Sequence, residues 1–145
     1  MSAWLRLLRG GAAVRRLLDA TLQAAHGLTV VEYEALLLLS QAEERAMRRI
    51  DLARELGLTP SGVTRLLDGL EHDGLVEKGT CASDARVTYA VLTDAGMKKL
   101  HECAPAHYAA IERLIGERLS DEEVESLSGL LGRLSDLDDD CTVGD

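Results

Sequence analysis

The sequence predicts a mainly α-helical protein whose centre carries two short helices followed by a β-hairpin. Residues 49–56 and 59–73 have apolar side chains at helical spacing, and Gly57 between them permits a sharp turn. Residues 75–78 and 86–92 are strand-like and flank the polar tip GTCASDA. This order predicts a winged helix-turn-helix, in which the second helix enters the DNA major groove and the hairpin reaches the flanking backbone or minor groove.

A long helix is expected before this centre. Its apolar side chains recur at helical spacing over residues 3–25, and Gly27 is placed to end it. The pair Gly10-Gly11 is a weak point at which the helix is expected to bend.

A second helix is predicted by a capping box. Thr29 and Glu32 have the T-x-x-E spacing, and the helix they start is expected to end near Gln41. Its centre is apolar almost all round, so burial on several sides is expected. The charged connection after it carries a minimal strand at Ala46–Met47.

The two central helices have specific end signals. Thr59 is expected to cap the second one, with Pro60 at its first position, where the missing N–H costs nothing, and Gly74 to stop it. In the shorter helix before it, four apolar residues are expected to face inward: Ile50, Leu52, Ala53 and Leu56.

Two more helices are expected after the hairpin. Thr93 caps a long one that should reach about Leu119, bent near Pro105. Ser120 and Glu123 form a second capping box, which starts a final leucine-rich helix.

Length and composition fit one domain of 145 residues with a sizeable core, since 46% of the residues are hydrophobic. No apolar run approaches the length of a membrane span, and the first helix lacks the apolar centre of a signal peptide. Three cysteines, far apart in the sequence, do not suggest a disulfide framework. A reducing cytoplasm is therefore the expected setting.

The net charge of −9 is unevenly distributed. Residues 1–40 carry +1, residues 41–100 carry −1 and residues 101–145 carry −9. The acidic residues thus lie away from the predicted DNA-reading part, which is roughly neutral. DNA binding is allowed, and we expect it to be weak outside a specific site and strongly dependent on salt concentration.

The second central helix is expected to have an apolar and a polar face. Its core-facing residues recur at i, i+3, i+4 and i+7: Val63, Leu66, Leu67 and Leu70. Its outward residues are Ser61, Gly62, Thr64, Arg65 and Asp68. Small hydroxyl residues and exposed amides near a helix start suit phosphate, and Arg65 can offer two donors to guanine or to phosphate. Thr59 is a candidate backbone contact as well as a cap. The alternative is that Arg65 is a solvated surface arginine.

The hairpin tip contains D-A-R, in which Asp84 can orient the guanidinium of Arg86. An oriented arginine suits a narrow minor groove. Lys78 is a candidate phosphate contact. The alternative is an ion pair that stabilises the turn and has no role with DNA.

The chain resembles the MarR family of bacterial regulators. The resemblance covers about residues 3–135 and is carried by LT-x-x-E-Y from Leu28, DLARELGLTPSGVTRLLDGLEHDGLVEK from Asp51, S-D-A-R from Ser83 and LT-x-x-G from Leu92. It implies a homodimer with two winged heads on a palindromic operator, and repression relieved by a small ligand or by cysteine oxidation. Family contacts would fall on Ser61, Thr64 and Arg65, and on Arg86 at the wing tip.

The resemblance also implies a domain organisation. Residues 30–100 would form the DNA-binding head, residues 1–29 and 101–137 the interlocking dimerisation helices, and residues 138–145 an acidic tail. Leucine stripes on the terminal helices support a dimer independently, because a small head could not cover them.

The sequence contains candidate residues for sensing three kinds of signal: a small effector, oxidation or a metal ion. An effector crevice, which the family often forms where the dimer arms meet the head, has five candidate residues: Trp4, Arg9, His26, Tyr33 and Glu34. The alternative is that Trp4 packs in the dimer interface. Cys81 at the wing tip is a candidate redox residue. Cys103 and His107, four apart on one helix, could share a metal only with further ligands such as His26 or Glu34.

The leading hypothesis is a dimeric DNA-binding transcriptional regulator, a repressor relieved by a small molecule, with double-stranded DNA as partner and no cofactor. An enzyme is not expected, because the chain shows no nucleophile–base pair, phosphate loop or complete metal site. The second hypothesis is a degenerate winged-helix dimer that binds a protein or small ligand. The acidic balance favours it, as do Gly69, His72 and Asp73 where the family usually carries basic residues.

Overall fold

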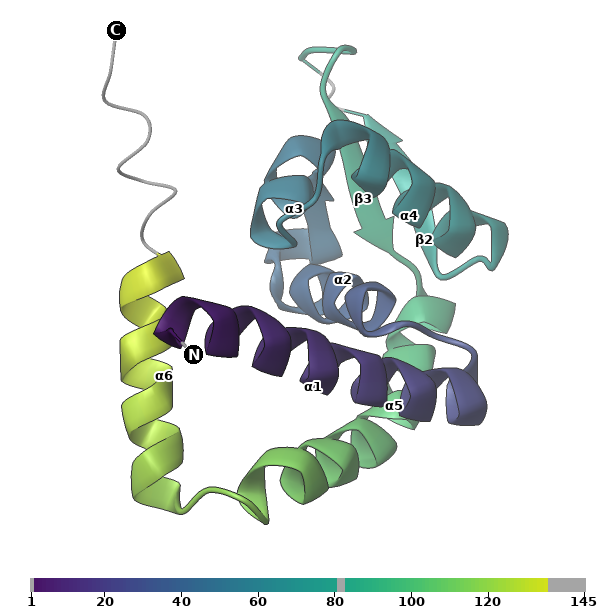
Figure 1. Ribbon diagram of the computed structural model, residues 1–145. Coiled ribbons are helices and arrows are strands. Elements are labelled where there is room, and N and C mark those ends of the chain that lie inside the picture. Colours follow the sequence, from purple (N-terminus) through teal and green to yellow (C-terminus); the bar gives the residue numbers. More distant parts are fainter. Residues whose placement is uncertain (1, 81–82, 136–145) are drawn as a thin grey trace, which may run out of the picture. The chain divides into compact units, whose positions relative to one another are not determined.

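The computed structural model describes residues 2–80 and 83–135. Over these residues the fold is mainly helical, as predicted, with one small sheet (Figure 1). The elements are α1 Ala3–His26, α2 Val30–Gln41, β1 Ala46–Arg48, α3 Arg49–Glu55, α4 Pro60–His72, β2 Val76–Thr80, β3 Thr88–Leu92, α5 Asp94–Ile111 and α6 Asp121–Ser135. The chain divides into two compact units, one ending at His107 and the other starting at Tyr108.

The junction between α1 and α2 follows its predicted capping signals. Gly27 ends α1 with a φ of 70°, in the left-handed region that favours glycine. The Glu32 N–H donates to Thr29 Oγ1 at 3.2 Å, and the Thr29 N–H donates to the Glu32 carboxylate at 2.8 Å, which completes the capping box. Asp19 of α1 accepts a further hydrogen bond from the Val30 N–H at 2.7 Å. The start of α2 is thereby fixed to α1.

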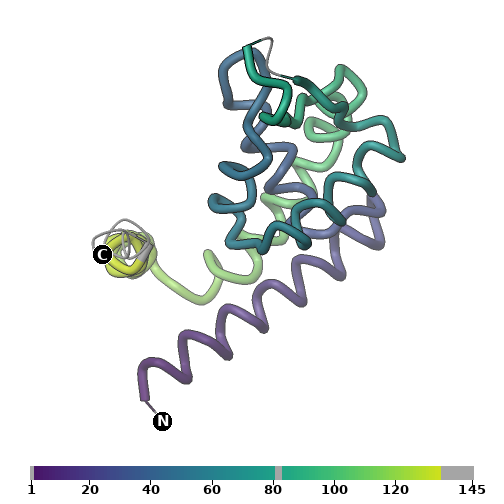
Figure 2. The backbone as a smooth tube through the Cα atoms, turned by 90° about the horizontal axis from the view of Figure 1, so that it is seen from above, coloured from purple at the N-terminus to yellow at the C-terminus, as the bar shows by residue number. Residues whose placement is uncertain are grey.

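Helix α1 is continuous through Gly10-Gly11, so the two glycines do not interrupt the helix. In Figure 2 its amino-terminal half extends away from α2, α3 and α4 of the same unit. Only its carboxyl-terminal half contributes fully buried side chains, Leu18 and Leu22. The amino-terminal half therefore presents its leucines to solvent in the single chain.

The sheet is antiparallel with the strand order β1-β3-β2. Ala90 at the centre of β3 pairs with Met47 of β1 on one side and with Lys78 of β2 on the other. The short strand β1 was predicted at Ala46–Met47 and is confirmed. It pairs with β3 and so attaches the hairpin to the segment between α2 and α3 along that strand.

Helix α3 contradicts one prediction: Ile50 does not face inward but is 72% exposed. Leu52 and Ala53 are buried as expected, and Leu56 is half-buried. With about 100° of rotation per residue, a spacing of two places Ile50 on nearly the opposite side of the helix from Leu52. The side of α3 that packs against the core is therefore narrower than predicted and does not include Ile50.

Helix α4 confirms its cap and its apolar face. The Gly62 N–H donates to Thr59 Oγ1 at 3.1 Å, with Pro60 at the first helical position. Three of the four predicted core residues are buried and Leu66 is half-buried; the buried ones are Val63, Leu67 and Leu70. The opposite, polar face of α4 is not needed for packing against the core.

The hairpin differs from its predicted bounds. Strand β2 extends over Val76–Thr80, so it includes part of the predicted tip, and β3 begins at Thr88 rather than at Arg86. The Asp84 carboxylate accepts the Arg86 N–H at 3.0 Å, and the Asp84 carbonyl accepts the Val87 N–H at 3.1 Å. These bonds close a turn, and a residue held in that turn cannot also join the strand ladder.

Three hydrogen bonds join the base of the hairpin to α5. Thr93 donates its hydroxyl to the Gly74 carbonyl at 2.7 Å, and its Oγ1 accepts the Gly96 N–H at 3.0 Å as the predicted cap. The Thr93 N–H donates to the Leu75 carbonyl at 3.1 Å. A Cβ at position 96 would overlap that same carbonyl oxygen, so glycine is required for this close approach.

Helix α5 is shorter than predicted. It contains Pro105, ends at Ile111 and continues as a π-helical turn over Glu112–Gly116, so it does not reach Leu119 as a regular helix. The Arg118 guanidinium donates to the carbonyls of Arg113 and Leu114 at 2.6 and 3.1 Å. These carbonyls belong to the last turn, which is where a helix leaves its acceptors unpaired.

The capping box of α6 is confirmed, with Ser120 and Glu123 bonded reciprocally at 2.9 and 3.3 Å. The core of the first unit is built largely from leucine, and its largest fully buried side chains are Leu22, Leu36, Leu39, Leu52, Leu67, Leu70 and Cys103. Among the described residues, no helix has the length and apolar character needed to cross a bilayer.

Candidate nucleic-acid interface

The outward face of α4 is polar and exposed, as its sequence predicted. Ser61, Thr64, Arg65 and Asp68 are all exposed, and with Pro60 they line a shallow hollow of about 550 Å³. The buried leucines on the opposite face hold the helix against the core. This surface is therefore available to a ligand in the single chain.

The hydroxyls at the start of α4 are already ordered by local bonds. Thr64 donates its hydroxyl to the Pro60 carbonyl at 3.0 Å, and the hydroxyls of Thr59 and Ser61 are 3.2 Å apart. The Thr64 proton is thus engaged, while its oxygen lone pairs stay available. Thr64 is prepared to accept a hydrogen bond from the amino group of a base.

Gly62 has a structural reason to be glycine in addition to its predicted place at the interface. It is half-buried, and a Cβ there would lie 3.1 Å from Thr59 Oγ1 and 3.6 Å from Leu58 Cβ. The first distance is tighter than an ordinary van der Waals contact. A small residue at this position lets the Thr59 cap close over the helix start.

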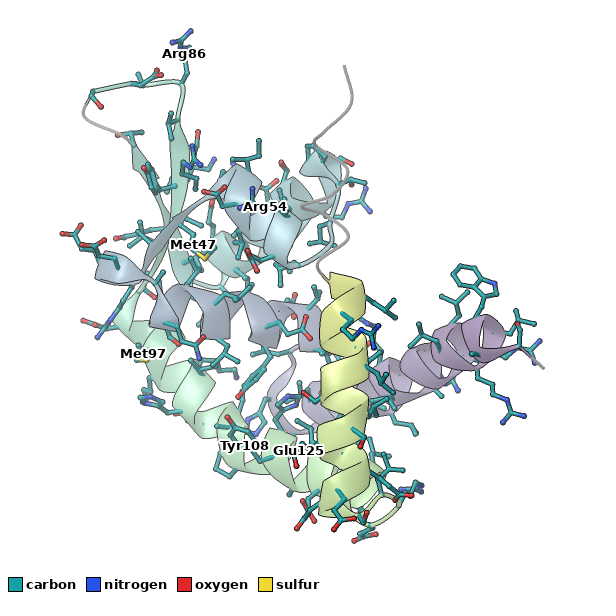
Figure 3. The ribbon with its side chains drawn as sticks, turned by 90° about the vertical axis from the view of Figure 1, so that its left-hand side faces the viewer. Met47, Arg54, Arg86, Met97, Tyr108 and Glu125 are labelled. Carbon is teal, nitrogen blue, oxygen red and sulfur yellow. The ribbon has the colours of Figure 1, made fainter. Side chains whose placement is uncertain are left out.

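Arg86 lies at the outer end of the hairpin, where Figure 3 shows it pointing away from the rest of the chain. Its Nε is 3.1 Å from Asp84 Oδ1 and its Nη2 is 3.3 Å from Asp84 Oδ2. The hydrogen bonds from the Arg86 side chain and backbone lower the pKa of Asp84 below its usual range. The carboxylate stays charged and orients the guanidinium, which is the arrangement that the D-A-R spacing predicted.

Lys78 is on β2 with its ammonium 3.7 Å from the Glu71 carboxylate of α4. This ion pair was not predicted. A phosphate at Lys78 would have to compete with Glu71. The geometry therefore supports a DNA contact by Lys78 less directly than one by Arg65.

Helix α3 adds arginines that the sequence patterns did not single out. Asp51 is bonded on one side by Arg48 at 2.7 Å and approached on the other by Arg54 at 3.4 Å. The hydrogen bond from Arg48 raises the pKa of that arginine. The signal that could have found them is the presence of three arginines within residues 48–54.

The five candidate effector residues differ in their surroundings. Tyr33 is 2% exposed and its ring centroid is 4.3 Å from that of His107, whereas Trp4 is 64% exposed near the start of α1. Arg9 is exposed, and His26 and Glu34 are half-buried. Trp4 is thus exposed near the start of α1, whereas Tyr33 is buried against His107 of α5.

The candidate metal and redox residues receive little support. Cys103 and His107 are buried on α5, and burial raises the pKa of the Cys103 thiol, which disfavours the thiolate that metals and oxidants need. Within residues 2–80 and 83–135, no three His, Cys, Asp or Glu side chains gather as a metal site. Cys81 lies outside the described residues.

The chain is similar to known transcription regulators. Residues 26–87 match the model of the MarR family. The HTH-type transcriptional repressor YetL of Bacillus subtilis (strain 168) is 32% identical over 111 residues, which make up 77% of this chain and 66% of YetL, slightly under two thirds of its length.

Two solved structures from Streptomyces coelicolor superpose on nearly the whole chain. Sco3205, a MarR family transcriptional regulator in complex with DNA, has a TM-score of 0.86 and 29% identity over 92% of this chain and 83% of that chain. AbsC, another MarR family transcriptional regulator, has a TM-score of 0.84 and 31% identity over 92% and 90% of the two chains. With its exposed α4 face, its anchored wing and these similarities, the chain belongs to the MarR family of transcriptional regulators.

Proposed function

We propose that the protein is a homodimeric repressor that binds a pseudo-palindromic operator with one head on each half-site. The observation that carries this proposal is the exposed polar face of α4, with Arg65 on it, beside a wing whose Arg86 is held outward by Asp84. The side chains of Arg65 and Arg86 can both contact DNA without a conformational change in the head. Since the partner is DNA, the site of action is expected to be the cytoplasm.

The chemistry of the two arginines differs. Arg65 extends from the first half of α4, where it can give two parallel hydrogen bonds to a guanine in the major groove. Arg86 extends from the wing, and its guanidinium suits the strong negative potential of a narrow minor groove. Thr64 and Ser61 add hydroxyl contacts beside Arg65, and Lys78 adds charge toward a phosphate.

The test is selection of binding sites from random DNA at low salt, followed by affinity measurements on the enriched sequence. We expect Arg65→Ala and Arg86→Ala each to weaken binding by about 10-fold to 100-fold, because each removes a contact worth about 1–3 kcal/mol. Lys98→Ala is the matched control, since it also removes one positive charge. Lys98 is exposed on α5, where it pairs with Glu102. No enriched sequence, or unchanged binding by both arginine variants, would contradict the proposal.

A dimer is supported by apolar side chains exposed in the single chain. On α1 they are Trp4, Leu5, Leu7, Leu8 and Leu17; on α6 they are Val124, Leu127, Leu130, Leu131 and Leu134. Soluble proteins rarely leave such stripes open to water. A two-fold partner would cover them and would set the two α4 helices about one DNA turn apart, roughly 34 Å.

We also propose that a small molecule relieves repression by binding at a crevice that Trp4, Arg9, His26, Tyr33 and Glu34 help to form in the dimer. The exposed indole of Trp4 supports this, since an aromatic face at a dimer arm can receive a flat ligand. Trp4 is the only tryptophan of the chain, so its fluorescence reports on this position alone. A ligand that dissociates DNA should change that emission; release of DNA with unchanged Trp4 emission would place the ligand elsewhere.

A further inference from the structure

A second hollow lies on the side of α4 that faces α3. It has a volume of about 230 Å³ and is lined by Arg49, Ile50 and Ala53 of α3 and by Pro60, Val63 and Thr64 of α4. Pro60 and Thr64 also line the hollow that contains Arg65. The two hollows therefore flank one ridge, formed by Pro60 and Thr64 near the start of α4.

Arg49 in this hollow has unusual hydrogen bonding. Its Nε and Nη2 are both buried, and neither has a hydrogen-bond partner in the part of the chain that the structure describes. The side chain as a whole is only half-buried, so it still reaches the surface. A buried donor without an acceptor destabilises the folded state, and more so when it carries charge.

The Asp51 carboxylate of α3 is not available to Arg49. Asp51 is engaged by Arg48 and Arg54, and over residues 2–80 and 83–135 Arg49 has no ion pair. The same is true of Arg65. Arg49 and Arg65 are thus two arginines of the helix-turn-helix that need not break an ion pair to bind an anion, and they lie on the two sides of the same ridge.

We propose that Arg49 binds a DNA backbone phosphate on the α3 side of α4, across the Pro60–Thr64 ridge from Arg65. The inference rests on the proposed DNA binding and extends the interface from α4 to α3. A helix that enters the major groove has a phosphate backbone on each side, and the first helix of this motif crosses one of them. The phosphate oxygens supply acceptors for Nε and Nη2 of Arg49, which meet none within residues 2–80 and 83–135.

The flexible stem of arginine makes this contact possible. The methylene groups of Arg49 can stay against Ala53 and Val63 while the guanidinium turns outward to the phosphate. A phosphate contact positions the protein on the duplex without reading its sequence. Arg49 should therefore strengthen binding to every DNA sequence by a similar factor, in contrast to Arg65.

The experiment compares Arg49→Met with Arg54→Met. Both variants keep an unbranched stem and remove one positive charge from α3, but Arg54 is exposed and paired with Asp51. Affinity is measured for the selected operator and for an unrelated duplex over a range of salt concentrations. For Arg49→Met we expect roughly 10-fold weaker binding to both duplexes and a salt dependence, log Kd against log salt, reduced by about 0.9, the value for one lost phosphate contact.

The control separates a contact from a general effect of charge. Arg54→Met is expected to keep the salt slope of the unaltered protein, and Arg49→Lys to recover most of the slope. Melting curves verify that Arg49→Met folds; greater stability is expected, because the unpartnered guanidinium is removed. A slope for Arg49→Met equal to that of the unaltered protein overturns the inference while leaving the proposed function intact, whereas absence of DNA binding by the unaltered protein overturns both.

Discussion

Two buried side chains on α5 have pKa values that burial moves in opposite directions. Burial raises the pKa of the Cys103 thiol and lowers the pKa of the His107 imidazole, because in both cases the charged form is disfavoured. His107 packs against the ring of Tyr33 on α2. The neutral imidazole therefore belongs to the folded state, where it helps to join α5 to α2.

His107 should make stability depend on pH. Its folded-state pKa is below the value of about 6.5 expected for the unfolded chain, so below that pH the unfolded chain binds a proton that the folded chain excludes. The free energy of unfolding should then fall as pH is lowered from about 7 to about 5.5, with no contribution from His107 at higher pH. Melting temperatures of His107→Gln across this range are expected to show a shallower dependence.

The exposed His101 on the same helix provides the comparison for that measurement. His101→Gln should keep the pH dependence of the unaltered protein. Equal slopes for His107→Gln and the unaltered protein would remove His107 as the source. The slope is the informative quantity, because replacing a buried ring also changes stability at every pH.

Gly96 is the residue at which the fold is least tolerant of an added methyl group. We expect Gly96→Ala to lower the free energy of unfolding by about 1–3 kcal/mol, the usual cost of forcing extra atoms into a packed site, because its Cβ would overlap the Leu75 carbonyl oxygen. Gly69→Ala is the control: nothing lies within 4 Å of its added Cβ, and alanine in a helix interior should stabilise by about 0.5–1 kcal/mol. Urea denaturation measures both, and equal effects would contradict the packing argument.

At the scale of elements, the helix starts were predictable from local chemistry. The caps at Thr29, Thr59, Thr93 and Ser120 all form the expected bonds, because a capping hydroxyl reaches an N–H only two or three residues away. No distant part of the chain is needed to close such a contact. The sequence alone was therefore sufficient for these positions.

Two predictions about single residues were wrong: that Arg86 begins the second strand of the hairpin, and that Ile50 faces the core. Arg86 has strand-compatible neighbours, but Asp84 captures its N–H in a turn, so the strand starts later. Ile50 is apolar and close to buried residues in sequence, yet its rotation about α3 directs it to the surface. Neither outcome follows from residue type, since each depends on the geometry of the partners that surround the segment.

At the scale of the whole molecule, the proposed DNA binding requires a chain with a net charge of −9 to meet a polyanion through a small number of well-placed cations. Several of them, including Arg86, Lys78 and Arg48, are held by carboxylates of the same chain. Affinity for DNA should accordingly be modest away from the operator and should fall steeply with salt. The chain belongs to the MarR family of transcriptional regulators, whose members include a protein solved in complex with DNA.

The apolar surface of α6 leads to a prediction about assembly. Leu130→Glu is expected to convert a dimer into a monomer and to lower the melting temperature, because a buried interface would receive an unpaired charge. Ser128→Glu, which adds the same charge on the side of the helix opposite Leu130, should leave the dimer intact. Sedimentation velocity at micromolar concentration distinguishes the two species. A monomeric unaltered protein, or a dimeric Leu130→Glu, would refute the interface.

The sequence by itself determined the order of elements, the caps, the apolar face of α4 and the D-A-R turn, because each of these depends on residues within about one helical turn or one hairpin of each other. Only the tertiary structure decided that Ile50 is exposed, that Asp51 is shared by Arg48 and Arg54, and that the buried Nε and Nη2 of Arg49 meet no acceptor among the described residues. The physical reason is distance along the chain. Burial and the pairing of charges are set by whichever segments the fold brings together, and periodicity within one segment does not specify them.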